Sequence, residues 1–313
     1  MKYPRKIAIG FQEGTCPLAC AKCLAFSPNA KKKKKSDKMP LEKALYLIDE
    51  AAEMEKVPVI QPHIFTEPFA NHDLRLIMQH CMAKKIGMSI ITNGILLNKD
   101  WLDFLIHELD RTVTLSFSLD AVSQKVYQKV RGNYELKKLE DKIEYLVNNR
   151  KKGGPRVTVN FAMESDNCSE ADDFIEKWKY KVDAVRVDTV FDFDKKISQK
   201  FINHNDKNNN LKCRFLDEVM VIDTDGKVRS CQLDAFGDTV FGNAFEEDIL
   251  SIWNGEKLNK VRLEQAEGKL KNIDFCYGCE VPYMTNHIKY ETDEFVILKA
   301  DCSVYYNYKG EIV

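Results

Sequence analysis

The sequence predicts an α/β fold in which an open or partial barrel of parallel strands precedes a smaller α+β unit. Two observations predict this fold class. In the first 190 residues, six short β-rich apolar runs alternate with charged stretches of amphipathic helical pattern, which indicates parallel strands joined by right-handed helical crossovers. Beyond this region the alternation stops and a hairpin pattern follows. Six strands are too few to close an eight-stranded barrel, so we expect an open or partial barrel.

The strands are predicted from runs such as "KIAIGF" and "VTLSFSL", and they fall at residues 6–11, 57–65, 87–92, 113–119, 156–163 and 183–190. Between them, apolar residues recur with helical spacing at residues 41–54, 74–85, 99–109, 136–151 and 170–180. The carboxyl ends of parallel strands share one edge of a sheet. We therefore expect the functional site at that edge and in the loops that follow it.

The polar stretch "INHNDKNNNLK", residues 202–212, is predicted to be a linker because it has little to bury. It separates a first domain, 1–201, from a second, 213–313. In the second domain, "VMVIDTDGKVR" predicts a hairpin around Asp225 and Gly226, a pair that tolerates the positive φ of a tight turn. Two short helices and a final strand pair are expected at residues 246–254, 256–268 and 294–310.

The composition is that of an ordinary soluble protein. The chain has 313 residues, a formal net charge of -1 and 44% hydrophobic residues. This charge balance excludes a strongly basic nucleic-acid binder, so we expect no nucleic-acid partner. No apolar run approaches the roughly 18 residues of a membrane span, and the N-terminal residues do not resemble a signal peptide. We therefore predict a cytoplasmic protein without a membrane partner.

Seven of the ten cysteines fall into two groups. In a reducing compartment the ten cysteines favour metal binding or catalysis over disulfides. Cys16, Cys20 and Cys23 follow the first predicted strand directly. Three thiolates from one loop suit a cubane iron–sulfur cluster whose fourth iron has no protein ligand. The alternative is a zinc site in which His63 or another distant residue supplies the fourth ligand.

The second group lies in the C-terminal domain, with the spacing C-x17-C-x44-C-x2-C: Cys213, Cys231, Cys276 and Cys279. Four thiolates suit either a tetrahedral zinc or a second [4Fe-4S] cluster, and spacing alone does not separate these two possibilities.

With its C-x3-C-x2-C loop behind a first strand, the sequence resembles the radical S-adenosylmethionine (SAM) enzymes. The resemblance implies a partial (βα)6 barrel, similar to a TIM barrel. It also implies a [4Fe-4S] cluster that binds SAM at its open iron. Reductive cleavage of SAM then gives a 5'-deoxyadenosyl radical, which abstracts a hydrogen atom from an unactivated C–H bond. One departure is Lys22, where the family favours an aromatic residue before the third cysteine.

The resemblance also implies SAM contacts at the ends of the strands. Glu67 and Pro68 match the end of the family's Gly-Gly-Glu-Pro motif, although Phe65 and Thr66 replace both glycines. Glu67 is expected near the SAM amino group. The resemblance implies six further SAM-binding residues on the following strands and loops: Thr92, Asn93, Ser118, Asp120, Arg131 and Asn160. Within this set, Ser118 and Asp120 are expected near the ribose and methionine, and Arg131 near the carboxylate.

The region around Cys231, "VRSCQLDAFGDTVFGNAFEEDILSIWNGEKLNKVR", resembles the SPASM/twitch extension of radical SAM enzymes. Because four cysteines are available there, the resemblance implies a single auxiliary [4Fe-4S] cluster, as in the shorter twitch form.

Three other features have two interpretations each. Cys168 follows the fifth strand and is either a hydrogen-atom donor to a substrate radical or a residue at a helix entry. Cys302 is likewise either a hydrogen-atom donor or a residue that only packs. The lysine run at 31–35 is either a solvated loop or a flap for an acidic substrate.

The predicted function is hydrogen-atom abstraction that modifies a ribosomally made peptide, by epimerisation, crosslinking or oxidation. An external one-electron reductant, such as a flavodoxin or ferredoxin, is expected as a partner. The alternative is dehydrogenation or epimerisation of a sugar or aminocyclitol. A more remote alternative is a zinc-stabilised binding module without catalysis.

Overall fold

The computed structural model describes residues 2–28, 35–189, 213–229, 231–233, 239–269, 276, 288–300 and 303–310. Its centre is a row of six strands, all parallel to their neighbours. In spatial order these are β1 (Lys6–Ile9), β4 (Val59–Gln61), β5 (Met88–Thr92), β6 (Val113–Ser118), β7 (Arg156–Met163) and β8 (Ala184–Thr189). The six predicted strands and the partial (βα)6 barrel are therefore confirmed.

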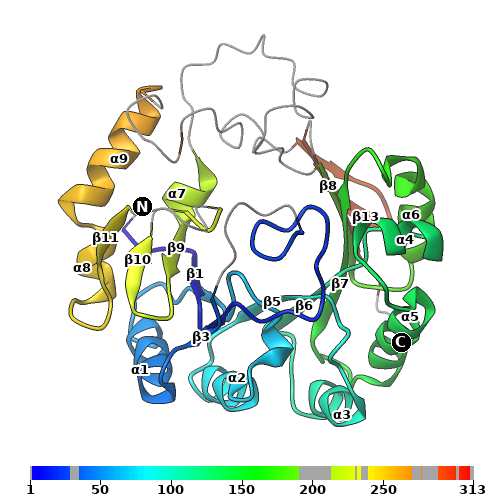
Figure 1. Cartoon of the computed structure of the whole chain (residues 1–313), viewed down its shortest axis with the longest axis horizontal. Helices are drawn as coiled ribbons and strands as arrows, with labels where there is room; N and C mark the ends of the chain where they lie inside the picture. The colour runs from blue at the N-terminus through cyan, green and yellow to red at the C-terminus, as the bar shows by residue number, and fades with distance from the viewer. Residues whose placement is uncertain are drawn as a thin grey trace.

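The predicted connecting helices are confirmed as well, and they lie on the outer side of the curved sheet (Figure 1). They are α1 (Leu41–Ala52), α2 (Leu74–Ala83), α3 (Lys99–His107), α5 (Leu136–Asn149) and α6 (Ala171–Trp178). An unpredicted helix, α4 (Gln124–Val130), precedes α5. The hydroxyl of Ser123 caps α4 by accepting the Val126 N–H at 3.3 Å.

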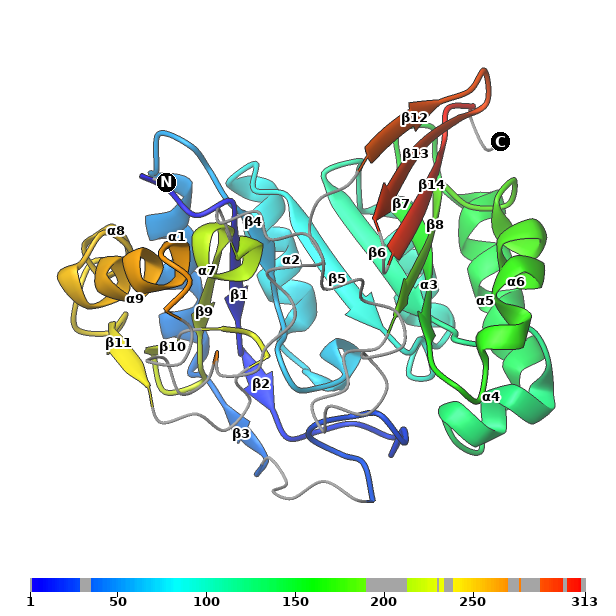
Figure 2. The ribbon, with the colours of Figure 1, turned by 90° about the horizontal axis from the view of Figure 1, so that it is seen from above.

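The two faces of the parallel sheet differ in polarity, as β6 shows. Val113, Leu115 and Phe117 are fully buried in the core shared with the helices. Their neighbours along the strand are only half-buried, and they include Ser116 and Ser118. Because successive side chains of a strand point to opposite faces, the inner face of β6 is polar. The loop that follows β1 lies on this inner side (Figures 1 and 2).

The C-terminal third of the chain extends the same sheet at both edges. At one edge β9 (Val219–Ile222) pairs parallel with β1, and β10 (Lys227–Arg229) and β11 (Val240–Asn243) continue it antiparallel. At the other edge β14 (Ser303–Tyr308) pairs antiparallel with β8, followed by β13 (Phe295–Ala300) and β12 (Ile288–Glu291). The predicted hairpin and final strand pair are confirmed. The division into domains 1–201 and 213–313 stays a prediction.

The remaining elements are short. The strands β2 (Gln12–Glu13) and β3 (Asp37–Lys38) form a separate pair. The helices are α7 (Arg214–Glu218), α8 (Ile249–Trp253) and α9 (Glu256–Ala266), with 3₁₀ turns at Pro68–Ala70 and Cys168–Glu170. Among the described residues, no helix is long and apolar enough to cross a membrane. Four predicted features lie outside the described residues: most of the lysine run, the linker at 202–212, Cys279 and Cys302.

Candidate functional site

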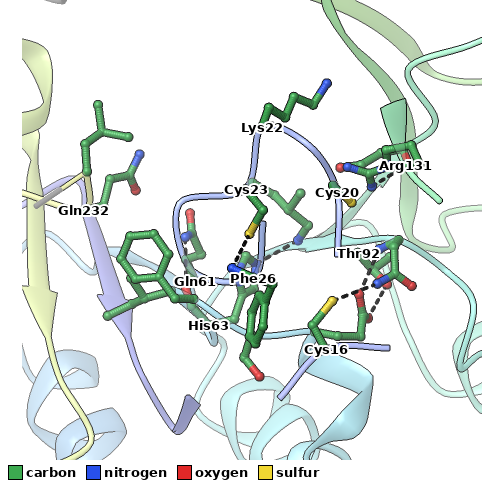
Figure 3. Close-up of a pocket in the computed structure, with 18 residues that line it drawn as sticks. Cys16, Cys20, Lys22, Cys23, Phe26, Gln61, His63, Thr92, Arg131 and Gln232 are labelled. Atoms are coloured by element: carbon green, nitrogen blue, oxygen red, sulfur yellow. Dashed lines mark hydrogen bonds between the residues drawn. The ribbon is translucent and has the colours of Figure 1, made fainter. Parts of the chain in front are cut away.

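A cavity of about 360 Å³ opens at the carboxyl ends of β1, β4, β5 and β6. All three cysteines of the N-terminal loop line it (Figure 3). Five of the predicted SAM-binding residues line it too: Glu67, Thr92, Asn93, Ser118 and Arg131. The structure therefore brings together residues from four separate loops that the sequence analysis connected only by order along the chain.

Local hydrogen bonds shape the three-cysteine loop. The Cys23 N–H donates to the Cys20 carbonyl at 3.0 Å, and the Cys23 sulfur accepts the Phe26 N–H at 3.3 Å. The Cys16 sulfur lies 3.6 Å from Asn93 Nδ2. Burial raises the pKa of the Cys16 thiol to about 11, and burial also raises the pKa of Cys20. Stable thiolates here therefore require a cation, which an iron–sulfur cluster supplies.

The donor set fits a cluster better than a single metal ion. Cys16, Cys20 and Cys23 are free thiols on one cavity. No three His, Cys, Asp or Glu side chains in the described ranges are grouped to hold one metal ion. His63, the proposed fourth zinc ligand, uses Nε2 to accept the Ile91 N–H at 2.9 Å. The described residues therefore give the zinc alternative no support at this loop.

Glu67 connects the ends of β4 and β5. Its carboxylate accepts the Thr92 hydroxyl at 2.5 Å and the Asn93 N–H at 2.9 Å. The residue is only 2% exposed, and this burial raises its pKa. Gly94 follows with φ +71°, and its N–H donates to the Thr92 hydroxyl. Glu67 thus holds this wall of the cavity in place, and its contact with the SAM amino group stays a prediction.

Asp120 lies behind the cavity wall rather than on it. It is 1% exposed, and one of its oxygens, Oδ2, lies 2.8 Å from Lys22 Nζ and 3.2 Å from an Arg131 nitrogen. Burial opposes its ionisation, but the charges of Lys22 and Arg131 hold the pKa of Asp120 below its usual range. Both cations line the cavity. Asp120 is therefore placed to orient them, and its contact with the ribose or methionine of SAM stays a prediction.

Arg131 also donates to the Ser118 carbonyl at 2.8 Å. Its Nε–H is buried and has no hydrogen-bond partner among the described residues. A buried donor without a partner on a cavity wall fits an anionic ligand group.

Like Asp120, two further predicted residues are not part of the cavity lining. Asn160 Oδ1 is buried without a hydrogen-bond partner in the described part of the chain, and Asn160 pairs in register with Ser118 on the neighbouring strand. The Cys168 thiol is exposed, and its sulfur lies 3.7 Å from the Ser165 carbonyl oxygen. The roles of both residues stay predictions.

The described members of the second cysteine set do not themselves line the cavity, but two residues next to one of them do. Gln232 and Leu233, which directly follow Cys231, line the cavity. Cys213 and Cys276 are buried, and the Cys213 N–H donates to Gln265 Oε1 at 3.2 Å. Sequence analysis did not identify Gln232, because its only signal is its position after a predicted ligand.

Two family models match the chain. The model described as the radical SAM superfamily matches residues 14–176, more than half of the chain. The SPASM model, described as an iron-sulfur cluster-binding domain, matches residues 213–280. An uncharacterized protein of Treponema pallidum (strain Nichols) is 24% identical over 231 residues. That alignment covers 69% of this chain and 63% of the relative, so the chain spans less than two thirds of the relative's length.

Three solved structures share the fold. The anSMEcpe structure with bound AdoMet has a TM-score of 0.65 and 15% identity. The match covers 87% of this chain and 84% of the anSMEcpe chain. Streptococcus suis SuiB bound to SAM has a TM-score of 0.62 and 18% identity. The match covers 83% of this chain and 68% of the SuiB chain. BtrN in complex with AdoMet and 2-DOIA has a TM-score of 0.57 and 17% identity. The match covers 88% of this chain and 92% of the BtrN chain.

The matched family implies a [4Fe-4S] cluster and SAM as cofactors, and the SPASM match implies auxiliary iron–sulfur clusters. The cysteine-lined cavity at the carboxyl ends of the parallel strands lies within the matched region. The chain belongs to the radical SAM superfamily and carries a SPASM-type domain in its C-terminal third.

Proposed function

We propose that this protein uses the three-cysteine loop to hold its SAM-binding [4Fe-4S] cluster and that it modifies a peptide by hydrogen-atom abstraction. The observation that carries the proposal is the placement of Cys16, Cys20 and Cys23 on one cavity. When bound, the cluster and SAM supply one-electron chemistry that yields a radical able to remove a hydrogen atom from an unactivated C–H bond.

The cavity walls would bind and orient SAM. Arg131 is proposed to bind the SAM carboxylate, because its Nε–H is buried without a partner among the described residues. Glu67 is proposed to face the amino group, with Thr92 and Asn93 fixed beside it. Ser118 and Asn160 are proposed to contact the ribose or methionine, with Asp120 orienting Arg131 from behind.

The C-terminal cysteines are proposed to hold one auxiliary [4Fe-4S] cluster: Cys213, Cys231, Cys276 and Cys279. The approach of Gln232 and Leu233 to the first cavity supports an auxiliary cluster close to the site of chemistry. An external one-electron reductant of flavodoxin or ferredoxin type is proposed as a partner, in a cytoplasmic setting.

Peptide modification is supported by two structural relatives. SuiB is bound to its precursor peptide SuiA in one structure, and anSMEcpe is bound to AdoMet and the Cp18Cys peptide in another. A small-molecule substrate is the second candidate, since BtrN is in complex with 2-DOIA. The polar inner face of the sheet, with Ser116 and Ser118 on β6, suits either class of substrate.

The test is SAM cleavage by anaerobically reconstituted protein, measured as 5'-deoxyadenosine by mass spectrometry. Cys16→Ala, Cys20→Ala and Cys23→Ala are each expected to reduce 5'-deoxyadenosine to background, because each removes one of three thiolate ligands. Cys276→Ala is expected to keep some SAM cleavage and lose product. Cys81→Ala is the matched control, since Cys81 is buried in α2 and outside the cavity lining. Unchanged cleavage in the three loop variants contradicts the proposal.

The same assay separates the two substrate classes. A short peptide encoded next to the gene is expected to become modified in a SAM-dependent reaction, with a mass change that the Cys20→Ala variant does not produce. SAM-dependent conversion of an aminocyclitol, with no change in the peptide, supports the second candidate instead.

A further inference from the structure

Lys22, the residue between the second and third cysteines of the loop, makes contacts far along the chain. Its ammonium lies 2.8 Å from Asp120 Oδ2 and 3.5 Å from Glu164 Oε1. It also donates to the Ala162 carbonyl at 2.9 Å, 140 positions away in sequence. The Lys22 side chain is 13% exposed, so these contacts are largely shielded from solvent.

The acceptors for Lys22 are themselves held in place. Asp120 adopts φ +61°, a conformation that few side-chain-bearing residues adopt without support. Its other oxygen accepts the Ala162 N–H at 2.6 Å, and its carbonyl accepts a hydrogen bond from the fully buried Asn167. Lys22 therefore binds a rigid acceptor formed where β6 and β7 end.

The charges around Lys22 balance. Lys22 and Arg131 are the cations, and Asp120 and Glu164 are the carboxylates. Asp120 contacts both cations, whereas the described structure pairs Glu164 with Lys22 alone. A neutral aromatic ring at position 22 would leave Glu164 unpaired. The ends of β6 and β7 are thus built for a cation at this position.

We propose that Lys22 is a positioning residue that fixes the cysteine loop to the ends of β6 and β7 by an ion pair with Asp120. The inference rests on the proposed function, because it takes Cys20 and Cys23 to be cluster ligands. Lys22 lies between these two residues (Figure 3), so its attachment restricts where both sulfurs can move. The lysine thus fixes the loop by an ion pair at the position where the family favours an aromatic residue.

The test is the rate at which anaerobically reconstituted protein releases iron to an excess of chelator. Lys22→Met is expected to release iron about tenfold faster than the unsubstituted protein, a loss typical of residues that orient metal ligands. Lys22→Arg is expected to stay close to the original rate because it keeps the charge. Lys22→Tyr, which introduces an aromatic residue, is expected to release iron as fast as Lys22→Met.

A double variant separates positioning from a general loss of stability. Lys22→Met leaves Glu164 without its cation, and adding Glu164→Gln removes that charge. The double variant is expected to recover thermal stability while its iron release stays fast. Recovery of both properties would mean that an unpaired charge, and not lost positioning, caused the effect, and it would overturn the inference.

Lys129→Met is the matched control, because Lys129 forms an exposed ion pair with Asp166 at 2.7 Å. Its iron release is expected to be unchanged. The inference also fails if Lys22→Met releases iron at the original rate, or if Lys22→Tyr does so. If the unsubstituted protein and Cys20→Ala take up equal iron with no cluster spectrum, the proposed function itself is wrong, and the two failures are therefore distinguishable.

Discussion

Lys6 is a largely buried cation on the face of β1 that also carries Ala8. Its ammonium lies 3.4 Å from Gln61 Oε1, and Gln61 lines the cavity. Burial, together with the positive charges of Arg186 and Arg214, lowers the pKa of Lys6 to about 8. Protonation of Lys6 is therefore less favourable in the folded protein than in the unfolded chain. The charge on Lys6 lowers the free energy of unfolding.

Lys6→Met is accordingly expected to stabilise the protein at pH 7. A pKa lowered from 10.5 to about 8 corresponds to at most about 3 kcal/mol. The gain is fully present below pH 8, where the lysine is protonated in both states. It shrinks as the pH rises from 8 to 10.5, because the folded-state lysine has then lost its proton, and it vanishes once the unfolded-state lysine is neutral as well. Urea unfolding of Lys6→Met and of the unsubstituted protein at pH 7 and pH 10 measures the gain at each pH.

The control for this prediction is Lys125→Met on the exposed surface of α4, with an expected change of less than about 0.5 kcal/mol at either pH. A Lys6→Met gain that is equal at pH 7 and pH 10 would show that the lysine charge is not its cause.

At the scale of elements, Asp183 joins the amino ends of neighbouring strands. It precedes β8, is 4% exposed and accepts the Val157 N–H of β7 at 2.7 Å. Its carboxylate also pairs with Arg150 after α5 at 2.5 Å and with Arg111 before β6 at 2.9 Å. These contacts outweigh the effect of burial and hold the pKa of Asp183 below its usual value.

Asp183→Asn is expected to destabilise the protein by about 3–5 kcal/mol, because it leaves Arg150 buried without its counter-charge. Since the folded-state pKa is lowered, this stabilisation is present above the ordinary pKa of 3.8 and is lost as the pH falls below it. Urea unfolding at pH 7 and near pH 3.5 is expected to show a smaller difference at the lower pH.

Glu144→Gln serves as the comparison for Asp183→Asn. Glu144 pairs with Lys181 at 2.8 Å across a largely exposed surface, so the expected cost is below about 1 kcal/mol. Equal effects of the two substitutions would contradict the role assigned to Asp183.

At the scale of the whole molecule, the C-terminal strands make one continuous sheet with the partial barrel. Phe295 of β13 lies against aromatic rings from two other segments, with ring centroids 5.3 Å from Tyr180 and 5.6 Å from Tyr308. Tyr180 follows α6, so this contact connects the C-terminal hairpin with the barrel.

The continuous sheet predicts a single unfolding transition in calorimetry of the reconstituted protein. Phe295→Ala is expected to cost about 3 kcal/mol and to lower the temperature of that one transition. Tyr290→Ala is the control, with little expected change, because Tyr290 is 50% exposed on β12. Two separable transitions, of which Phe295→Ala shifts only one, would contradict this expectation and favour the predicted division into two domains.

The sequence alone determined which segments form strands and helices and which loop carries the thiols. Some strand runs alternate in burial as β6 does, and others, such as β1, are apolar and buried almost throughout. The apolar residues of the helices recur on one face, so local patterns suffice for these elements. Cys16, Cys20 and Cys23 are neighbours in sequence, so their spacing is itself enough to indicate a cluster. The short helix α4 was not predicted because seven residues are too few to show a clear helical repeat of apolar residues.

Only the tertiary structure decided which distant residues meet. The ion pair of Lys22 with Asp120, the approach of Gln232 to the cavity and the placement of C-terminal strands at both sheet edges depend on contacts between segments remote in sequence. Such contacts depend on how the sheet is ordered and registered in space, and a local pattern carries no information about either. Lys22 looks like a lost aromatic contact in the sequence and becomes an ionic attachment only once β6 and β7 bring Asp120 and Glu164 beside it.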